Sequence, residues 1–201
     1  MVAVGIGAAI YLACAAVAGR GSVPEPEREA FHAINGLPDW LWAVAFPVQL
    51  LGVLVVPFVL APVAAILGRW RLAAALAAIP VLKYVLEYGV IKRTIHRARP
   101  FTSVCQQDPT CAEFRNVPLV GPSFVSGHAI IAAATAVVLL PYLSRPWGRV
   151  AVVLLALGVA ASRIYLGAHN PLDVVGGLAV GTVLGSALNV ALGVPRGGGR
   201  R

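Results

Sequence analysis

Several apolar runs of bilayer-spanning length constrain this chain more than any other feature of its sequence. Of its 201 residues, 59% are hydrophobic and only 12% are charged. A transmembrane helix needs about 20 consecutive apolar residues, and the polar segments between the runs are short enough to serve as loops. The pattern therefore predicts one polytopic, all-α membrane domain covering residues 1–201 and excludes a soluble globular protein.

We expect six transmembrane helices, with both termini on the same side of the membrane. The second run contains Pro47, Pro57 and Pro62, so we expect that helix to kink. A further segment at about residues 25–35 mixes charged and apolar side chains, which is typical of a helix lying on the membrane surface. The six runs cover about residues 2–18, 40–67, 72–91, 127–143, 150–162 and 171–194.

Arginines in the short connections predict the orientation of the bundle. The formal net charge is +8, but the arginines lie between apolar runs, so topology and anionic lipid explain them better than nucleic acid does. By the positive-inside tendency, their face is cytoplasmic, and the segments 92–121 and 162–173 face outward. The arginines of the cytoplasmic loops and of the basic tail at 196–201 are Arg69, Arg71, Arg145, Arg149, Arg196, Arg200 and Arg201.

Two cysteines in the long outer segment are close enough in sequence to close a small ring. Cys105 and Cys111 would form a disulfide in the oxidising environment outside the cell. Two free thiols or a metal-binding pair are the alternatives. The metal signal is weak because no second pair of cysteines or histidines lies nearby.

The segment 162–173 places an arginine, a histidine and an aspartate between two apolar runs. Asn170-Pro171 predicts a helix start, which puts His169 just before the helix and Asp173 in its first turn. A carboxylate in that place can accept a hydrogen bond from one imidazole nitrogen and leave the other free as a nucleophile. The alternative is that Asp173 only caps the helix.

Two further polar stretches fall on the same predicted face. Lys92 and Arg99 bracket a basic segment that could clamp a phosphate or anchor anionic headgroups. Ser126-Gly127-His128 precedes a helix, where a serine cap, free N–H groups and a histidine acid would suit an anionic ester. A structural role for the histidine is the alternative.

One more charged pair lies within an apolar run. Lys83 and Glu87 are four residues apart on one helix face, so they can pair inside the membrane. We interpret this pair as structural, with lining of the site as the weaker alternative.

Together these residues have the groups needed for phosphoryl transfer without a metal. Cations neutralise the phosphate oxygens, one histidine attacks, and the other protonates the leaving group. No cluster of acidic residues suggests a metal site, so we expect no metal and no cofactor. The cations are Lys92, Arg99 and Arg163, the uncharged donors are Ser126 and Gly127, and the remaining groups are His128, His169 and Asp173.

The three stretches resemble the motifs of the type 2 phosphatidic acid phosphatase (PAP2) superfamily. The first is a lysine, six residues and Arg-Pro at residues 92–100; the second is Ser126-Gly127-His128; the third is Ser-Arg, five residues, His, three residues, Asp at residues 162–173. Val125 departs from the second motif, where proline usually precedes the serine. Soluble vanadium haloperoxidases share these motifs, but the apolar runs argue against that branch.

The resemblance implies a role for each matching residue. His169 would be the nucleophile that forms a phosphohistidine, Asp173 would orient it, and His128 would be the general acid. The remaining matches would bind the phosphate. These are Lys92, Arg99, Ser126, Gly127 and Arg163.

We therefore expect an integral membrane lipid phosphatase of the bacterial inner membrane with its site on the outer face. Its partners would be the bilayer and a lipid phosphate that enters sideways between helices. The predicted location favours polyprenyl (undecaprenyl) diphosphate over phosphatidate, phosphatidylglycerol phosphate or a phosphorylated polyprenyl sugar. Alternatives of another class are a transporter, for which the expected repeated halves are missing, and a catalytically silent lipid-binding relative.

Overall fold

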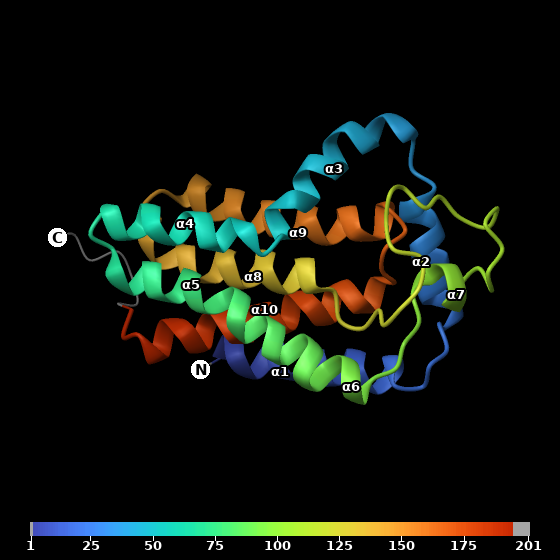
Figure 1. Cartoon of the computed structure of the whole chain (residues 1–201), viewed down its shortest axis with the longest axis horizontal. Coiled ribbons are helices and arrows are strands. Elements are labelled where there is room, and N and C mark those ends of the chain that lie inside the picture. Colours follow the sequence, from blue (N-terminus) through green and yellow to red (C-terminus); the bar gives the residue numbers. More distant parts are fainter. Residues whose placement is uncertain (1, 195–201) are drawn as a thin grey trace.

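The computed structural model describes residues 2–194, and these residues form an elongated bundle of helices without strands (Figure 1). The predicted basic tail at 196–201 lies outside the described residues. The longer helices are α1 (Val2–Ala18), α2 (Glu25–Asn35), α3 (Trp42–Gln49), α4 (Val55–Ile66), α5 (Trp70–Tyr84), α8 (Gly127–Leu139), α9 (Pro146–Tyr165) and α10 (Pro171–Ala191). The shorter elements are η1 (Asp39–Leu41), η2 (Leu50–Gly52), η3 (Val85–Ile91), α6 (Lys92–Thr94), α7 (Pro100–Ser103) and η4 (Leu140–Tyr142).

Within residues 2–194, three helices are long and apolar enough to cross a membrane, namely Trp70–Thr94, Pro146–Tyr165 and Pro171–Ala191. A fourth span results if the bent pair Asp39–Gly52 and Val55–Ile66 is counted as one. Two shorter apolar helices, α1 and the segment formed by α8 and η4, accompany them. The all-helical membrane fold is thus confirmed, and the count of six transmembrane helices stays a prediction.

The predicted kink in the second run is a break between α3 and α4, whose axes differ by 61°. The break contains Gly52, which packs against the start of α8. A Cβ atom at this position would lie 2.8 Å from the Cβ of His128 and 2.8 Å from Val159. Because a side chain cannot fit there, glycine lets the broken helix approach a predicted site residue.

The third run is longer than expected and has an irregular middle. Helices α5, η3 and α6 form one continuous helical segment over Trp70–Thr94, and η3 has π-helical hydrogen bonding. Such insertions are frequent at functional sites. Here the π segment contains Glu87, and Lys92 follows directly after it.

Close packing of α10 on α8 sets the geometry of the site. Gly177 of α10 lies so near α8 that an added Cβ would be 2.6 Å from the carbonyl oxygen of Ser126. One turn earlier on α10, the carbonyl oxygen of Asp173 accepts a hydrogen bond from the Ser126 N–H at 2.9 Å. Small residues at such an interface let two membrane helices approach closely. The second and third motifs are thereby held against each other.

Helix α2, at the position predicted for a surface helix, covers one end of the bundle (Figure 1). Its Glu27, Phe31 and Asn35 are buried on one face, whereas Glu25 and Glu29 are exposed. Phe31 packs with apolar residues of α8, α9 and α10. The amphipathic pattern therefore reflects packing of α2 against the other helices, as well as a polar outer face.

Candidate active site

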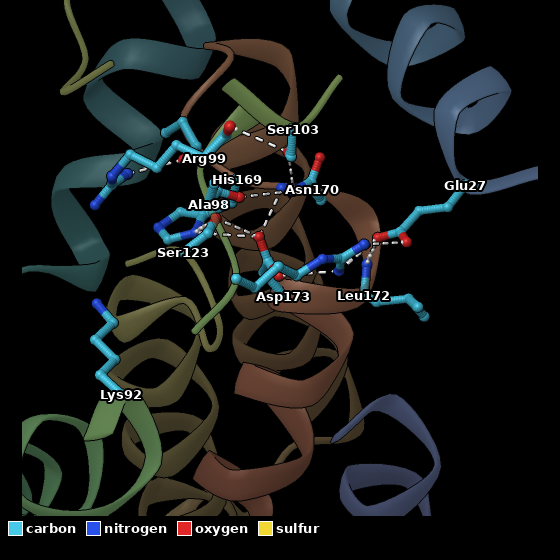
Figure 2. A network of polar contacts seen from close by, with 12 residues as sticks. Glu27, Lys92, Ala98, Arg99, Ser103, Ser123, His169, Asn170, Leu172 and Asp173 are labelled. Carbon is cyan, nitrogen blue, oxygen red and sulfur yellow. Dashed lines mark hydrogen bonds and ion pairs between the residues drawn. The ribbon is translucent and has the colours of Figure 1, made fainter. Parts of the chain in front are cut away.

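The three polar stretches of the sequence meet at the end of the bundle that also holds α2 and α7 (Figure 1). The first stretch begins in the last turn of the span Trp70–Thr94, the second leads into α8, and the third joins α9 to α10. Figure 2 shows a polar network that includes Arg99 of the first stretch, His169, Asn170 and Asp173 of the third, and Ser123, which precedes the second. All eight residues predicted for catalysis or phosphate binding lie in or beside these stretches.

His169 and Asp173 face each other at the start of α10. The His169 Nδ1 lies 3.7 Å from Asp173 Oδ2, and the Ser123 hydroxyl lies between the two groups. Ser123 Oγ donates to Asp173 Oδ2 at 2.5 Å and is 3.3 Å from His169 Nδ1 (Figure 2). Since these groups occupy the Nδ1 side of the ring, Nε2 is the nitrogen left for chemistry.

Asp173 caps α10 as well as facing His169. Its Oδ2 accepts a hydrogen bond from the Asn170 backbone N–H at 2.8 Å, which is the bond that the acidic residue of a capping box makes. The predicted helix start at Asn170-Pro171 is confirmed. One carboxylate thus fixes the helix start and the adjacent imidazole together.

Burial sets the charge state of His169. The side chain is 3% exposed, and its desolvation lowers the imidazole pKa to about 4. The Asp173 carboxylate opposes this shift, and the Arg163 and Arg99 guanidinium groups add to it. The ring is therefore neutral at pH 7, which is the form that can attack an electrophile.

Arg97 connects Asp173 to α2 in a buried group of charges that we call the carboxylate cluster: Glu27, Arg97 and Asp173. Arg97 donates to both Glu27 oxygens, at 3.0 and 2.5 Å, and to Asp173 Oδ1 at 3.2 Å. Burial by itself would lower the Arg97 pKa, but the two carboxylates outweigh it and raise the pKa. The cation is therefore permanent.

Three of the predicted phosphate-binding residues have buried polar atoms without a protein partner. Among residues 2–194, the Nε atoms of Arg99 and Arg163 and the Oγ of Ser126 are buried and make no hydrogen bond. Buried polar groups are nearly always paired, so unpaired ones call for a ligand or another explanation. Their guanidinium groups are anchored elsewhere: Arg99 donates to the carbonyl of Ala168 at 2.8 Å, and Arg163 donates to Gln49 Oε1.

Lys92 is buried and belongs to a second group of charges, the lysine cluster: Lys83, Glu87 and Lys92. Glu87 lies between the two lysines, with its Oε2 2.5 Å from Lys83 Nζ and its Oε1 2.5 Å from Lys92 Nζ. The predicted pairing of Lys83 with Glu87 is confirmed. The same carboxylate also holds Lys92, a predicted phosphate ligand, so the structural role and the lining of the site both stay predictions for this pair.

Gly127 and His128 open α8 beside the lysine cluster. A Cβ atom on Gly127 would lie 2.5 Å from Glu87 Oε2 and 2.7 Å from Lys83 Cε. Glycine is therefore needed for packing against this cluster, besides any contact with a ligand. His128 is half-buried and within electrostatic reach of Arg163 and His169.

Cys105 and Cys111 are joined by a disulfide, with Cα atoms 5.4 Å apart, and close a small loop at the same end of the bundle. The following residues tie this loop to neighbouring helices. Asn35 of α2 donates to the Glu113 carbonyl at 2.8 Å, and Arg115 donates to the Tyr165 carbonyl at 2.8 Å.

Sequence reasoning gave no role to Ser123, Arg97, Glu27 or Gln49. Their partners are distant along the chain: 70 residues separate Glu27 from Arg97, and 114 separate Gln49 from Arg163. One signal was available for Glu27, because it shares a helix face with Phe31 and Asn35. A carboxylate on the apolar face of an amphipathic helix is usually paired.

The described residues contain no group of three or more His, Cys, Asp and Glu side chains that could hold a metal ion. That the protein needs no metal stays a prediction, which an activity assay tests.

Comparison with known proteins places this geometry in a family. The family model described as the PAP2 superfamily matches residues 68–193. Among solved structures, the first transmembrane PAP2-type phosphatidylglycerolphosphate phosphatase from Bacillus subtilis is 25% identical with a TM-score of 0.72, over 98% of this chain and 99% of that one. LpxE from Aquifex aeolicus is 26% identical with a TM-score of 0.66, over 80% of this chain and 92% of that one.

Comparison with curated protein sequences gave no match. The family match covers well over half of the chain and includes all three motifs, and both structural likenesses extend over most of it. The chain therefore belongs to the PAP2 superfamily of membrane phosphatases.

Proposed function

We propose that this protein is a metal-independent phosphatase that hydrolyses a lipid phosphate or diphosphate through a phosphohistidine at His169. The observation that carries the proposal is the combination of a neutral, buried His169 with unpaired donor atoms on Arg99, Arg163 and Ser126. These donors would bind the oxygens of a phosphate held in front of the imidazole. The proposal also fits the family to which the chain belongs.

In the proposed first step, His169 Nε2 attacks phosphorus and the bond from phosphorus to the leaving oxygen breaks. His128 gives that oxygen a proton, so the lipid leaves as an alcohol or as a lipid monophosphate. A water molecule then attacks the phosphohistidine, passing its proton to His128, and inorganic phosphate is released. Asp173 and Ser123 hold the Nδ1 side of His169 throughout.

The preferred substrate in this proposal is polyprenyl diphosphate, of which undecaprenyl diphosphate is the bacterial form. Its support is the arginine distribution in the sequence, from which we predict a site on the outer face of the membrane. A second candidate is phosphatidylglycerol phosphate. That candidate is favoured by the likeness to the Bacillus subtilis phosphatidylglycerolphosphate phosphatase, which extends over 98% of this chain.

Phosphate release by the purified protein would test both parts of the proposal. The panel contains undecaprenyl diphosphate, undecaprenyl phosphate, phosphatidate and phosphatidylglycerol phosphate, with EDTA present and His169→Ala as the blank. We expect selective release from the diphosphate. Release mainly from phosphatidylglycerol phosphate would overturn the preferred substrate and keep the mechanism, whereas a strict metal requirement would overturn the mechanism.

Trapping of the covalent intermediate tests the nucleophile directly. Brief exposure to lipid substrate carrying ³²P in its terminal phosphate should leave label on the wild-type protein and none on His169→Ala. Label that persists in His169→Ala would place the nucleophile elsewhere.

A further inference from the structure

Helix α2 carries the one buried carboxylate of the carboxylate cluster that lies outside all three PAP2 motifs. Glu27 is 7% exposed and comes from a helix whose outer face is polar. Its hydrogen-bond partners are distant in the sequence: Arg97 is 70 residues away and Leu172 is 145 residues away. Placing a carboxylate in a buried site is costly unless it is fully paired, so its contacts indicate what it does.

Glu27 accepts hydrogen bonds from both terminal nitrogens of the Arg97 guanidinium. Arg97 Nη1 and Nη2 donate to the two oxygens of Glu27, and only Nη1 also reaches Asp173, at Oδ1 and 3.2 Å. A guanidinium favours two parallel hydrogen bonds to one carboxylate. Without Glu27, the same two donors could turn to both oxygens of Asp173.

The second oxygen of Asp173 is the one that the nucleophile needs. Oδ2 accepts from the Ser123 hydroxyl at 2.5 Å and from the Asn170 N–H at 2.8 Å, and it faces His169 Nδ1 at 3.7 Å. A guanidinium seated on both oxygens would compete with each of these contacts. Glu27 also accepts the backbone N–H of Leu172 at 2.9 Å, so it fixes the first turn of α10 beside Asp173 (Figure 2).

We propose that Glu27 is a positioning residue for the reaction: it holds Arg97 on one oxygen of Asp173 and leaves the other to Ser123 and His169. This inference rests on the proposed phosphatase function, and it makes helix α2 a part of the active site. Because Glu27 acts through Arg97, it needs no contact with substrate.

Three substitutions in the full-length protein separate the effect of charge from the effect of hydrogen-bond geometry. Glu27→Gln removes the negative charge, Arg97→Gln removes the positive charge, and Arg97→Lys keeps the positive charge but loses the planar pair of donors. Glu29→Gln is the matched control, because it is an exposed glutamate on the same helix. Each variant is measured for kcat, KM and the pH dependence of kcat on the lipid that the wild type hydrolyses.

We expect all three substitutions in the cluster to lower kcat by about 10²-fold with little change in KM, because the nucleophile is misplaced and the phosphate site is intact. Glu29→Gln should match the wild type. A purely structural role would instead reduce the amount of active enzyme and scale the whole pH profile without moving it.

The acidic limb of the pH profile should move in opposite directions. Loss of the Arg97 cation lets a proton bind the His169–Asp173 pair more readily, so Arg97→Gln should shift the limb to higher pH. Loss of the Glu27 anion should shift it to lower pH, and Arg97→Lys should leave it in place. Arg99 and Arg163, the other cations facing His169, are unchanged in all variants. Equal profiles in all variants, or a wild-type kcat in Glu27→Gln, would overturn the inference.

Histidine-selective NMR in micelles keeps the test independent of turnover. The protein has only four histidines, so the His169 signal can be assigned with His169→Ala. Opposite shifts of its protonation midpoint in Glu27→Gln and Arg97→Gln would support the positioning role even if no lipid in the panel is hydrolysed. An active enzyme with an unmoved midpoint would refute the positioning role and leave the phosphatase function standing.

Discussion

Two buried ionic clusters flank the site, and their charge ratios are opposite. In the carboxylate cluster, two anions share the single cation of Arg97. In the lysine cluster, two cations share the single anion of Glu87. The first therefore has a formal charge of −1 beside His169, and the second has a formal charge of +1 that includes a predicted phosphate ligand, Lys92.

The difference between the clusters corresponds to the two charges that the proposed reaction must stabilise. His169 becomes cationic when it is phosphorylated, and a net negative cluster next to it favours that state. The substrate phosphate is anionic, and a net positive cluster favours its binding. Neutral pairs would cost less to bury, so the excess charges indicate function more than stability.

Removal of the negative charge nearest the nucleophile should have the largest effect. We expect Asp173→Asn to lower kcat by about 10⁴-fold, as loss of the orienting carboxylate does in hydrolases with a Ser-His-Asp triad. The amide keeps the size of the side chain and can still accept the Asn170 N–H. Phosphate release per folded protein, with melting temperature as the check on folding, measures the effect. A loss of less than tenfold would mean that the carboxylate cluster does not serve the nucleophile.

The excess cation of the lysine cluster should affect binding instead. Lys83→Met keeps the length of the side chain and leaves a neutral Lys92–Glu87 pair, so we expect KM for the lipid phosphate to rise about tenfold with kcat little changed. Lys92→Met is the matched variant, because it removes the same charge from the same carboxylate.

The comparison of these two lysine variants sharpens the interpretation. A larger effect of Lys92→Met would show direct contact with phosphate, and equal effects would show that the cluster acts through charge alone. An unchanged KM in both would contradict a phosphate-binding role for the cluster.

Features that depend on residues close in sequence were predicted, whereas most contacts within the two clusters were not. The start of α10 at Asn170-Pro171, helix α2 and the Lys83–Glu87 pair follow from spacing within a few residues, and the structure contains all three. The kink in the second run was also predicted, because proline acts on the helix locally.

The long-range partners could not be predicted in the same way. Arg97 lies within the first motif stretch, but its partners Glu27 and Asp173 are 70 and 76 residues away. No periodicity within a helix specifies such pairs, because they arise from how helices pack. The spacing rules also missed that Glu87 serves Lys92, since the π segment of η3 changes which residues share a helix face.

Acidification should lower activity mainly by protonating His169, which lies beside the carboxylate cluster. As the pH falls from 7 to 4, we expect the acidic limb of kcat/KM to have its midpoint near pH 4, because the His169 pKa is lowered to about 4. Loss of the His128 proton should give a separate limb at higher pH. The free energy of unfolding should decrease over the same fall in pH. The unfolded chain takes up a proton at its ordinary histidine pKa of about 6.5, whereas the native site resists it.

Initial rates and thermal unfolding measured across this pH range provide the check, with His169→Ala as the control for stability. The His169→Ala protein should lose less stability on acidification than the wild type. An acidic limb of kcat/KM with its midpoint near pH 6.5 would show that burial does not keep His169 neutral.

The smallest effect on activity should come from the disulfide loop, which contacts neither cluster directly. Cys105 and Cys111 close a short ring, so we expect Cys105→Ser with Cys111→Ser to cost about 2 kcal/mol of stability. Activity at 25 °C should stay within about twofold of the wild type, because Asn35 and Arg115 still tie the loop to the bundle. Thermal unfolding and phosphate release of the double variant, compared with wild-type protein before and after reduction, measure both effects. A large loss of kcat with a normal KM would mean that the loop transmits strain to the carboxylate cluster, and the division of the site into two independent clusters would then fail.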